Sequence, residues 1–197
     1  MSLLVKICGL SEARHVAVAI DAGAGAIGFV FAESVRRIAP DIATAICVNV
    51  PRHIKRVAVM LHPSDEDWQD VLQNFAPDVL QTDADDFAVL EVPESVQRWP
   101  VYREGQENPE SGGTYVYEGA NSGHGQTVDW SRAAQHARRG QMMLAGGLGA
   151  HNVGAAVAVV RPYGVDVSSA VESTPGRKDS DLIRKFIRAA RVAERSP

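Results

Sequence analysis

The chain has 197 residues, of which 45% are hydrophobic, and a formal net charge of −4 at pH 7. This charge, with arginines that are scattered except on the last predicted helix, argues against nucleic acid or an anionic membrane as a partner. No apolar run approaches the roughly 20 residues of a membrane span, and strand-like sequence begins too near the N-terminus for a signal peptide. We therefore expect a cytoplasmic protein.

Short apolar runs typical of buried strands recur along the chain, and stretches with helical spacing of apolar residues follow most of them. Eight such runs are present: 5–9, 26–31, 56–61, 78–81, 100–103, 114–118, 142–145 and the run that starts at residue 164. The first and the last stop abruptly at small or polar residues. This is expected where a buried parallel strand carries functional groups at its carboxyl end.

Helix signals separate these runs. Ser11 is a plausible N-cap of a helix that Gly23 ends, and Ser64 or Asp65 opens another that Pro77 ends. Residues 152–160 and 179–194 are predicted to form two more. The segment 104–113 is too rich in Gly, Pro, Glu and Asn for a good helix, so the helix after the fifth strand should be short or missing. A solvated basic face is expected on the last helix, at Arg184, Lys185, Arg188 and Arg191.

Strand and helix alternate through the whole chain, which predicts an α/β fold with a parallel sheet. Eight repeats favour closure of this sheet into a (β/α)₈ TIM barrel that occupies residues 1–197 as a single domain. The length is near the lower limit for such a barrel and leaves no room for a second domain. A doubly wound open sheet with miscounted strands is the alternative.

Cys8 is the first candidate for chemistry. Lys6 and Cys8 lie two residues apart on a strand and therefore face the same side, the barrel interior, with Cys8 nearer the rim. A nearby ammonium favours the thiolate, so we expect a thiol pKa lowered toward neutrality and a role as base or nucleophile. The alternative is a small buried hydrophobic residue. The other cysteine, Cys47, sits in a helix-like segment, so neither a disulfide nor a metal site is expected.

Asp129 is the second candidate. It follows a glycine-containing loop, 122–126, after the sixth strand and stands just before a predicted helix. The position suits an N-cap as well as a catalytic carboxylate, and the two roles are compatible. His124 in the same loop is either a ligand-binding donor or a surface histidine.

Two loops carry signals for phosphate binding. Gly146 and Gly147 follow the seventh strand, and Ser168, Ser169 and Ala170 follow the eighth. In (β/α)₈ barrels these two loops commonly bind phosphate through backbone N–H groups. Bare turns are the alternative. Arg36, after the second strand, could pair with a substrate carboxylate, or else be a surface arginine like Arg37.

Several motifs together, in order and over nearly the whole chain, resemble phosphoribosylanthranilate isomerases of tryptophan biosynthesis. The motifs are Lys6-Ile7-Cys8-Gly9, residues 21–31, Val128-Asp129-Trp130, residues 144–148 with Asn152-Val153, and Gly164 to Ser169 with Val171-Glu172, Pro175-Gly176 and Lys178-Asp179. The resemblance implies a cofactor-free Amadori rearrangement of N-(5-phosphoribosyl)anthranilate, a small phosphorylated substrate, to 1-(2-carboxyphenylamino)-1-deoxyribulose 5-phosphate.

By the same resemblance, Asp129 matches the general acid that protonates the ring oxygen, and Cys8 matches the base that removes the C2′ proton. Arg36 matches the arginine that contacts the anthranilate. The backbone around Gly147 and Ser169-Ala170 matches the phosphate clamp. The oligomeric state stays open between a monomer and a homodimer.

The chain departs from the family pattern at four places. Val35 replaces a proline before Arg36, Thr82-Asp83-Ala84 replaces a Leu-His-Gly sequence, His124 replaces a threonine, and Ala170 replaces a glycine. If Ala170 needed a positive φ, it would cost about 1 kcal/mol. Asp83 would repel a substrate carboxylate unless its side chain points away or a positive charge compensates it. We expect His124 and Arg36 to supply this positive charge, and we expect His62 to be a surface residue. Two rival functions are an isomerase of another phosphorylated amino-sugar and a non-catalytic barrel that binds a phosphate ligand.

Overall fold

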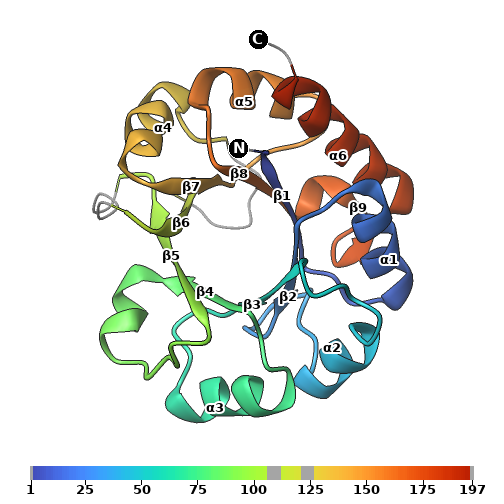
Figure 1. Ribbon diagram of the computed structural model, residues 1–197, viewed down its shortest axis with the longest axis vertical. Coiled ribbons are helices and arrows are strands. Elements are labelled where there is room, and N and C mark those ends of the chain that lie inside the picture. Colours follow the sequence, from blue (N-terminus) through green and yellow to red (C-terminus); the bar gives the residue numbers. More distant parts are fainter. Residues whose placement is uncertain (1, 106–111, 121–126, 196–197) are drawn as a thin grey trace.

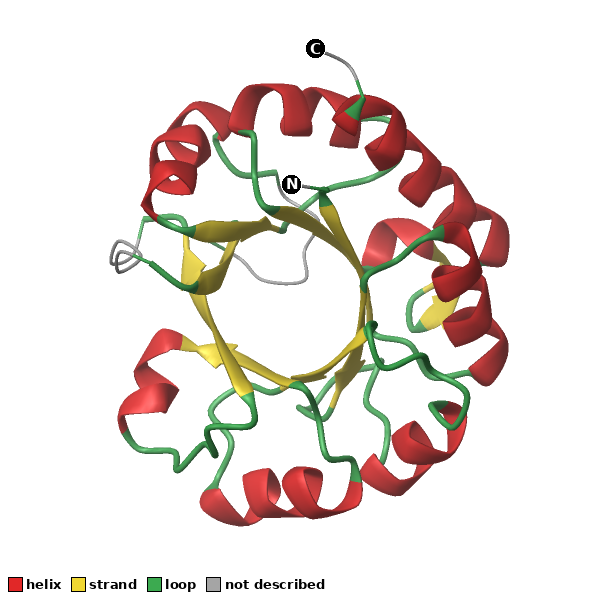
Figure 2. Ribbon diagram, viewed as in Figure 1, coloured by secondary structure: helices red, strands yellow, loops and turns green. Residues whose placement is uncertain are grey.

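A computed structural model of the chain describes residues 2–105, 112–120 and 127–195. Eight parallel strands close into a barrel in sequence order. Figure 2 shows this barrel from one end. The strands are β1 (Leu4–Cys8), β2 (Ala26–Val30), β3 (Lys55–Val59), β4 (Val79–Asp83), β5 (Gln97–Arg103), β6 (Thr114–Glu118), β7 (Gln141–Leu144) and β8 (Gly164–Val167). The predicted TIM barrel is therefore confirmed and the open-sheet alternative is wrong, because β1 pairs with both β2 and β8.

Helices cover the outside of the barrel (Figure 1). They are α1 (Ala13–Ala22), α2 (Pro40–Ile46), α3 (Asp65–Asn74), α4 (Trp130–His136), α5 (Val153–Val160) and α6 (Ser180–Glu194). Short 3₁₀ segments are η1 (Ala84–Ala88) after β4, η2 (Ala137–Arg139) after α4 and η3 (Ser169–Val171) after β8. Most of the segment 104–113, where a short or missing helix is predicted, lies outside the described residues, and its described residues 104–105 and 112–113 form no helix. None of the described helices is long and apolar enough to cross a membrane.

Local sequence explains where two helices start and stop. Gly23 adopts φ 104° and ends α1, as predicted, because a residue without Cβ enters this left-handed region at little cost. Ser64 is the N-cap of α3, where its side chain and that of Asp67 form a capping box. The predicted cap of α1 is wrong by one residue, since Glu12 occupies that position and makes no side-chain cap.

The predicted basic face of α6 is only partly confirmed. Arg184, Lys185 and Arg188 are exposed. Arg191 instead donates hydrogen bonds to the backbone oxygens of Leu3 (2.6 Å) and Gly23 (2.7 Å). This arginine therefore fastens the last helix to the start of β1 and the end of α1, a role that helical periodicity does not reveal.

The inside of the barrel holds a buried charge pair as well as apolar side chains. Lys6 is fully buried and its Nζ lies 3.0 Å from Oδ1 of Asp166 on β8, the neighbouring strand. A Cβ on Gly28 would lie 3.1 Å from both Cys8 Sγ and Lys6 Cε. Lys6 and Cys8 thus face the barrel interior, as predicted, and the absence of a side chain at Gly28 leaves them room.

Candidate active site

A cavity of about 340 Å³ opens at the carboxyl ends of the strands. It is lined by most of the predicted site residues, namely Cys8, Arg36, Gly146, Gly147, Ser168 and Ser169. Asp83, Arg103, Glu118 and Asp166 also line it, whereas Asp129 and Ala170 are not among its lining residues. This is the end of the barrel where ligands bind in enzymes of this fold.

Cys8 ends β1 and is almost fully buried. Burial raises the pKa of the Cys8 thiol above its ordinary value, and the Asp166 carboxylate raises it further, although the Lys6 ammonium acts in the opposite direction. The expected lowering of this pKa is therefore wrong for the free protein. The main reason is burial, which disfavours the charged thiolate, and the ion pair between Lys6 and Asp166 adds to it because the Lys6 charge does not favour the thiolate alone.

Asp129 is the N-cap of α4. Its Oδ1 accepts hydrogen bonds from the backbone N–H of Ser131 (2.8 Å) and Arg132 (3.3 Å), and its own N–H donates to Glu104 Oε1 (3.0 Å). The side chain is exposed, and the hydrogen bonds from Ser131 hold the pKa of Asp129 below its usual range. The structure thus shows the capping role. His124 and the rest of 121–126, which precede Asp129, lie outside the described residues.

The two predicted phosphate loops lie next to each other. Gly146 and Gly147 adopt positive φ angles of 86° and 60°, and Asn152 fixes the turn by donating to Gly147 O (2.9 Å) and accepting from Gly149 N–H (2.8 Å). A Cβ on Gly149 would lie 3.4 Å from that of Ala170 in η3. Ala170 itself is not in the left-handed region, so its replacement of a glycine brings no backbone strain.

Arg36 projects from the loop after β2 and is held by Glu172. The contacts are 2.7 Å from Nε to Oε1 and 2.9 Å from Nη2 to Oε2. Lys178 Nζ lies 2.6 Å from the same carboxylate and donates to Ser168 O (3.0 Å). A Cβ on Gly9, which has φ 73°, would lie 2.7 Å from Arg36 Cδ. The missing side chain at Gly9 thus makes room for Arg36.

Sequence reasoning assigned no role to Glu172 and Lys178, which belong to the short hairpin of β9 (Glu172–Thr174) and β10 (Arg177–Lys178). Both side chains are almost wholly buried. The sequence signal that could have pointed to them is a glutamate and a lysine six residues apart after the last barrel strand. Periodicity does not show that this hairpin folds back onto the loop of Arg36.

Neither expected offset of Asp83 is confirmed, because Arg36 does not contact it and His124 lies outside the described residues. Asp83 Oδ2 lies 2.7 Å from Arg103 Nη1 and 3.4 Å from His62 Nε2, while Arg36 is engaged by Glu172. His62 has a largely exposed side chain, as expected, but it also contacts Asp86 at 2.8 Å, and this contact raises its pKa. Arg103, at the end of β5, is thus the partner of Asp83.

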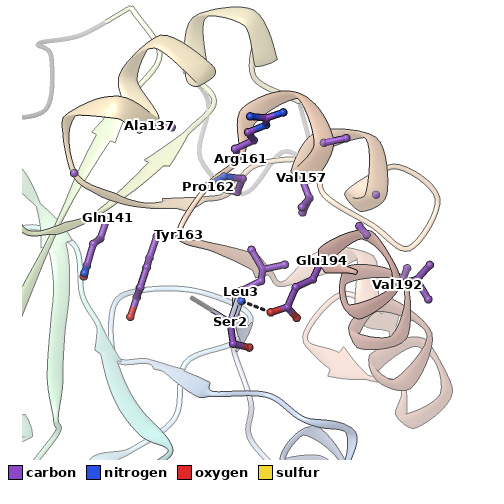
Figure 3. A pocket seen from close by; sticks show the side chains of 15 residues that line it. Ser2, Leu3, Ala137, Gln141, Val157, Arg161, Pro162, Tyr163, Val192 and Glu194 are labelled. Atoms are coloured by element: carbon purple, nitrogen blue, oxygen red, sulfur yellow. Dashed lines mark hydrogen bonds between the residues drawn. The ribbon is translucent and has the colours of Figure 1, made fainter. Parts of the chain in front are cut away.

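A larger hollow, of about 710 Å³, lies at the opposite end of the barrel (Figure 3). It is bordered by the residues before β1 and β8 and by α5 and α6, and Leu3 N–H donates to Glu194 there (2.7 Å). Small apolar side chains such as Ala137, Val157 and Val192 line much of it. None of the candidate catalytic or phosphate-binding residues reaches it. The smaller cavity is therefore the candidate active site.

Comparison with known proteins agrees with this geometry. Residues 5–189 match the family described as N-(5'phosphoribosyl)anthranilate (PRA) isomerase. The N-(5'-phosphoribosyl)anthranilate isomerase of Listeria monocytogenes serotype 4a (strain HCC23) is 33% identical over 210 residues, which cover 98% of this chain and all of that one.

Two solved structures are similar along almost their whole length. A phosphoribosyl anthranilate isomerase in complex with reduced 1-(o-carboxyphenylamino)-1-deoxyribulose 5-phosphate has a TM-score of 0.79 and 29% identity, covering 96% of this chain and 99% of the other. A structure described as monomers of the dimeric enzyme from Thermotoga maritima has a TM-score of 0.77 and 30% identity, with the same coverage. The chain therefore belongs to the phosphoribosylanthranilate isomerase family of tryptophan biosynthesis.

Proposed function

We propose that this chain isomerises N-(5-phosphoribosyl)anthranilate with Cys8 as general base and Asp129 as general acid. The family membership gives the reaction, and the observation that carries the residue assignment is that Cys8 and Arg36 line one cavity with the glycine and serine loops after β7 and β8. The reaction converts an aminoaldose into an aminoketose. No cofactor is required, because the substrate nitrogen stabilises the cation formed when the sugar ring opens.

The ring-opening step needs a proton on the furanose oxygen. Asp129 is proposed to donate it, from its place at the start of α4 on the same end of the barrel. A carboxylate held by Ser131 and Arg132 N–H groups is well oriented but favours the ionised form. We propose that Asp129 takes up this proton from solvent when the substrate binds, because the anionic phosphate and anthranilate carboxylate then favour the protonated form of its carboxyl group.

The second step removes the proton at C2′. A protonated Schiff base beside the buried Cys8 thiol would favour the thiolate, since an opposite charge in a desolvated site lowers a thiol pKa. The raised thiol pKa of the free protein and the proposed base role are then compatible. The thiol first releases its own proton to solvent, the thiolate then takes the C2′ proton, and the C2′–H bonding electrons move toward the iminium to give an enolamine, which tautomerises to the product ketone.

The two anionic ends of the substrate have separate partners. The backbone around Gly146, Gly147, Ser168, Ser169 and Ala170 is proposed to hold the phosphate, supported by the turn that Asn152 braces. Arg36 is proposed to contact the anthranilate. Glu172 fixes the guanidinium at Nε and Nη2, which leaves the Nη1 side of the fork for a ligand.

The test is growth of a tryptophan auxotroph that lacks this isomerase, with the gene supplied in trans, together with loss of anthranilate fluorescence when the purified protein meets phosphoribosylanthranilate. Rescue and turnover support the proposal. Turnover of another phosphorylated amino-sugar alone, or binding of phosphate ligands without turnover, favours one of the two rival functions.

We also propose a cellular location and an oligomeric state. The enzyme is expected in the cytosol, where small phosphorylated substrates of amino-acid biosynthesis occur, as either a monomer or a homodimer. The Thermotoga maritima relative is described as dimeric. Light scattering of the purified chain decides between the two states.

A further inference from the structure

One wall of the cavity is built by the carboxyl ends of β4, β5 and β6, which present Asp83, Arg103 and Glu118. Arg103 Nη1 lies 2.7 Å from Asp83 Oδ2, and Arg103 Nε lies 3.2 Å from Glu118 Oε1. The three side chains are each 14–16% exposed, so they are largely removed from solvent yet reach the cavity. Two carboxylates thus fix one guanidinium in the wall.

The charges of this wall matter because the substrate is an anion at both ends. Among the described residues that line the cavity, Arg36 and Arg103 are the two lysine or arginine side chains. Arg36 shares Glu172 with Lys178, so that group keeps a positive charge. Arg103, by contrast, is a positive charge that contacts both the Asp83 and the Glu118 carboxylate. Without it, the wall would lose the positive charge that lies beside the Asp83 and Glu118 carboxylates, and the repulsion of an anion by carboxylates is stronger in a partly desolvated pocket than in water.

His62 is a weaker offset than Arg103. Its Nε2 lies 3.4 Å from Asp83 Oδ2, but 65% of its side chain is exposed, and water and salt screen an exposed charge. A second hollow, lined by His62 and Tyr102, shares Asp83, Val101 and Arg103 with the cavity. The Asp83–Arg103 pair therefore stands between the cavity and this outer hollow, with Arg103 as the buried cation.

We propose that Arg103 is a specificity-determining residue of this chain: it offsets the Asp83 and Glu118 carboxylates, so that the wall formed by β4, β5 and β6 admits a substrate that carries a carboxylate. The inference rests on the proposed isomerase function. It explains how Asp83 stands where the family pattern has histidine without excluding an anionic substrate. Arg103 acts here through the charge of the wall, as a positioning residue and not as a proton donor.

The test is a double-mutant cycle in KM and kcat. Arg103→Gln should raise KM for phosphoribosylanthranilate at least about tenfold, equivalent to about 1.4 kcal/mol, with a smaller change in kcat. Asp83→Asn should lower KM or leave it unchanged, because it removes one negative charge. The double variant Asp83→Asn/Arg103→Gln should return KM to within about threefold of the wild-type value, since it removes both charges of the pair.

The substrate carboxylate is tested with N-(5-phosphoribosyl)aniline, which lacks it. For this analogue the rise in KM caused by Arg103→Gln should be at least about threefold smaller. Arg98→Gln is the matched control, because Arg98 lies on the same strand, is exposed and donates to Val92 O outside the cavity. Its KM should equal that of the wild type.

Three results would overturn the inference: an unchanged KM in Arg103→Gln, no recovery in the double variant, or an equal rise for both substrates. If Arg103→Gln does not fold, Arg103→Lys replaces it, and a raised KM in either this charge-conserving variant or the double variant counts against the proposal. Failure of the wild-type protein to turn over phosphoribosylanthranilate would instead contradict the proposed function, so the two failures are distinguishable.

Discussion

Glu172 binds Arg36 at two points and Lys178 at a third, with contacts of 2.7, 2.9 and 2.6 Å. The carboxylate is 4% exposed and the Lys178 side chain is fully buried. One negative charge therefore fixes two cations, and the group keeps a net positive charge beside the cavity. Its geometry holds the guanidinium in place before substrate arrives, which reduces the entropy lost on binding.

Arg36→Ala should raise KM for phosphoribosylanthranilate at least about tenfold, because a charge-assisted contact to the anthranilate is worth about 1.5–3 kcal/mol. Steady-state kinetics measures the change. Arg37→Ala is the control, since the Arg37 side chain is 60% exposed and lies 3.9 Å from its partner Glu33. Equal KM values in the two variants would contradict contact between Arg36 and the substrate.

Glu172 should make the free energy of unfolding depend on pH in the acidic range. The Arg36 and Lys178 hydrogen bonds outweigh burial and lower the pKa of Glu172 from 4.5 to about 2. The carboxylate of the folded state thus holds its charge where that of the unfolded state gains a proton. Its stabilisation is fully present above pH 4.5 and is lost as the pH falls through about 2, by on the order of 3 kcal/mol.

The measurement for Glu172 is the free energy of unfolding in urea, taken at several pH values from 6 to 2. Glu172→Gln should be less stable near neutral pH and should show a shallower decline with acid than the wild type. Glu33→Gln is the control because the Glu33 side chain is 99% exposed. Parallel curves for the wild type and Glu172→Gln would show that another carboxylate causes the acid dependence.

Cys8→Ala should abolish detectable turnover and leave the fold intact, because it removes the proposed base from the rim of the barrel and leaves most of the core unchanged. General base catalysis contributes roughly 10²–10⁴-fold. Cys47→Ala is matched to it, since Cys47 is also a buried free thiol but follows α2, away from the cavity. Near-normal kcat in Cys8→Ala would refute the base assignment.

Asp129→Asn should likewise abolish turnover while α4 stays formed, because asparagine is as good an N-cap as aspartate but offers no carboxylic proton. Asp179→Asn is the control, because it makes the same substitution at the N-cap of α6, where Asp179 accepts hydrogen bonds from the Asp181 and Leu182 N–H groups. Circular dichroism should be unchanged in both variants. If the two lose activity equally, or neither loses it, the acid role of Asp129 fails.

Inorganic phosphate and sulfate should compete with substrate. A crystal grown in high sulfate should show the anion at the rim between Gly147 and Ala170, since backbone N–H groups in a turn braced by Asn152 favour an anion without a lysine. Asn152→Ala should weaken inhibition by phosphate several-fold. Sulfate bound in another hollow, with this rim empty, would contradict the prediction.

Much of the fold followed from the sequence. A strand buried on both faces reads as a short apolar run, and eight runs separated by helix signals correspond to β1–β8 with small shifts at their ends. Because parallel strands all end on one edge, the residues after them, such as Cys8, Arg36 and Gly147, were predicted to share a rim, and they line one cavity. Patterns within short segments were enough for these predictions, because the apolar pattern of a strand and the direction in which it runs are properties of the segment itself.

Only the tertiary structure decided which charges meet. Arg36 lies 136 residues from Glu172, and Lys6 lies 160 residues from Asp166. No period or spacing relates such positions, because their contact depends on barrel closure and on the fold of the β9–β10 hairpin. The same holds for the pKa of Cys8, whose direction is set by burial against the distances to Lys6 and Asp166. Sequence names the charged groups, but their electrostatic balance is a function of separation and solvent exclusion, which exist only in the folded chain.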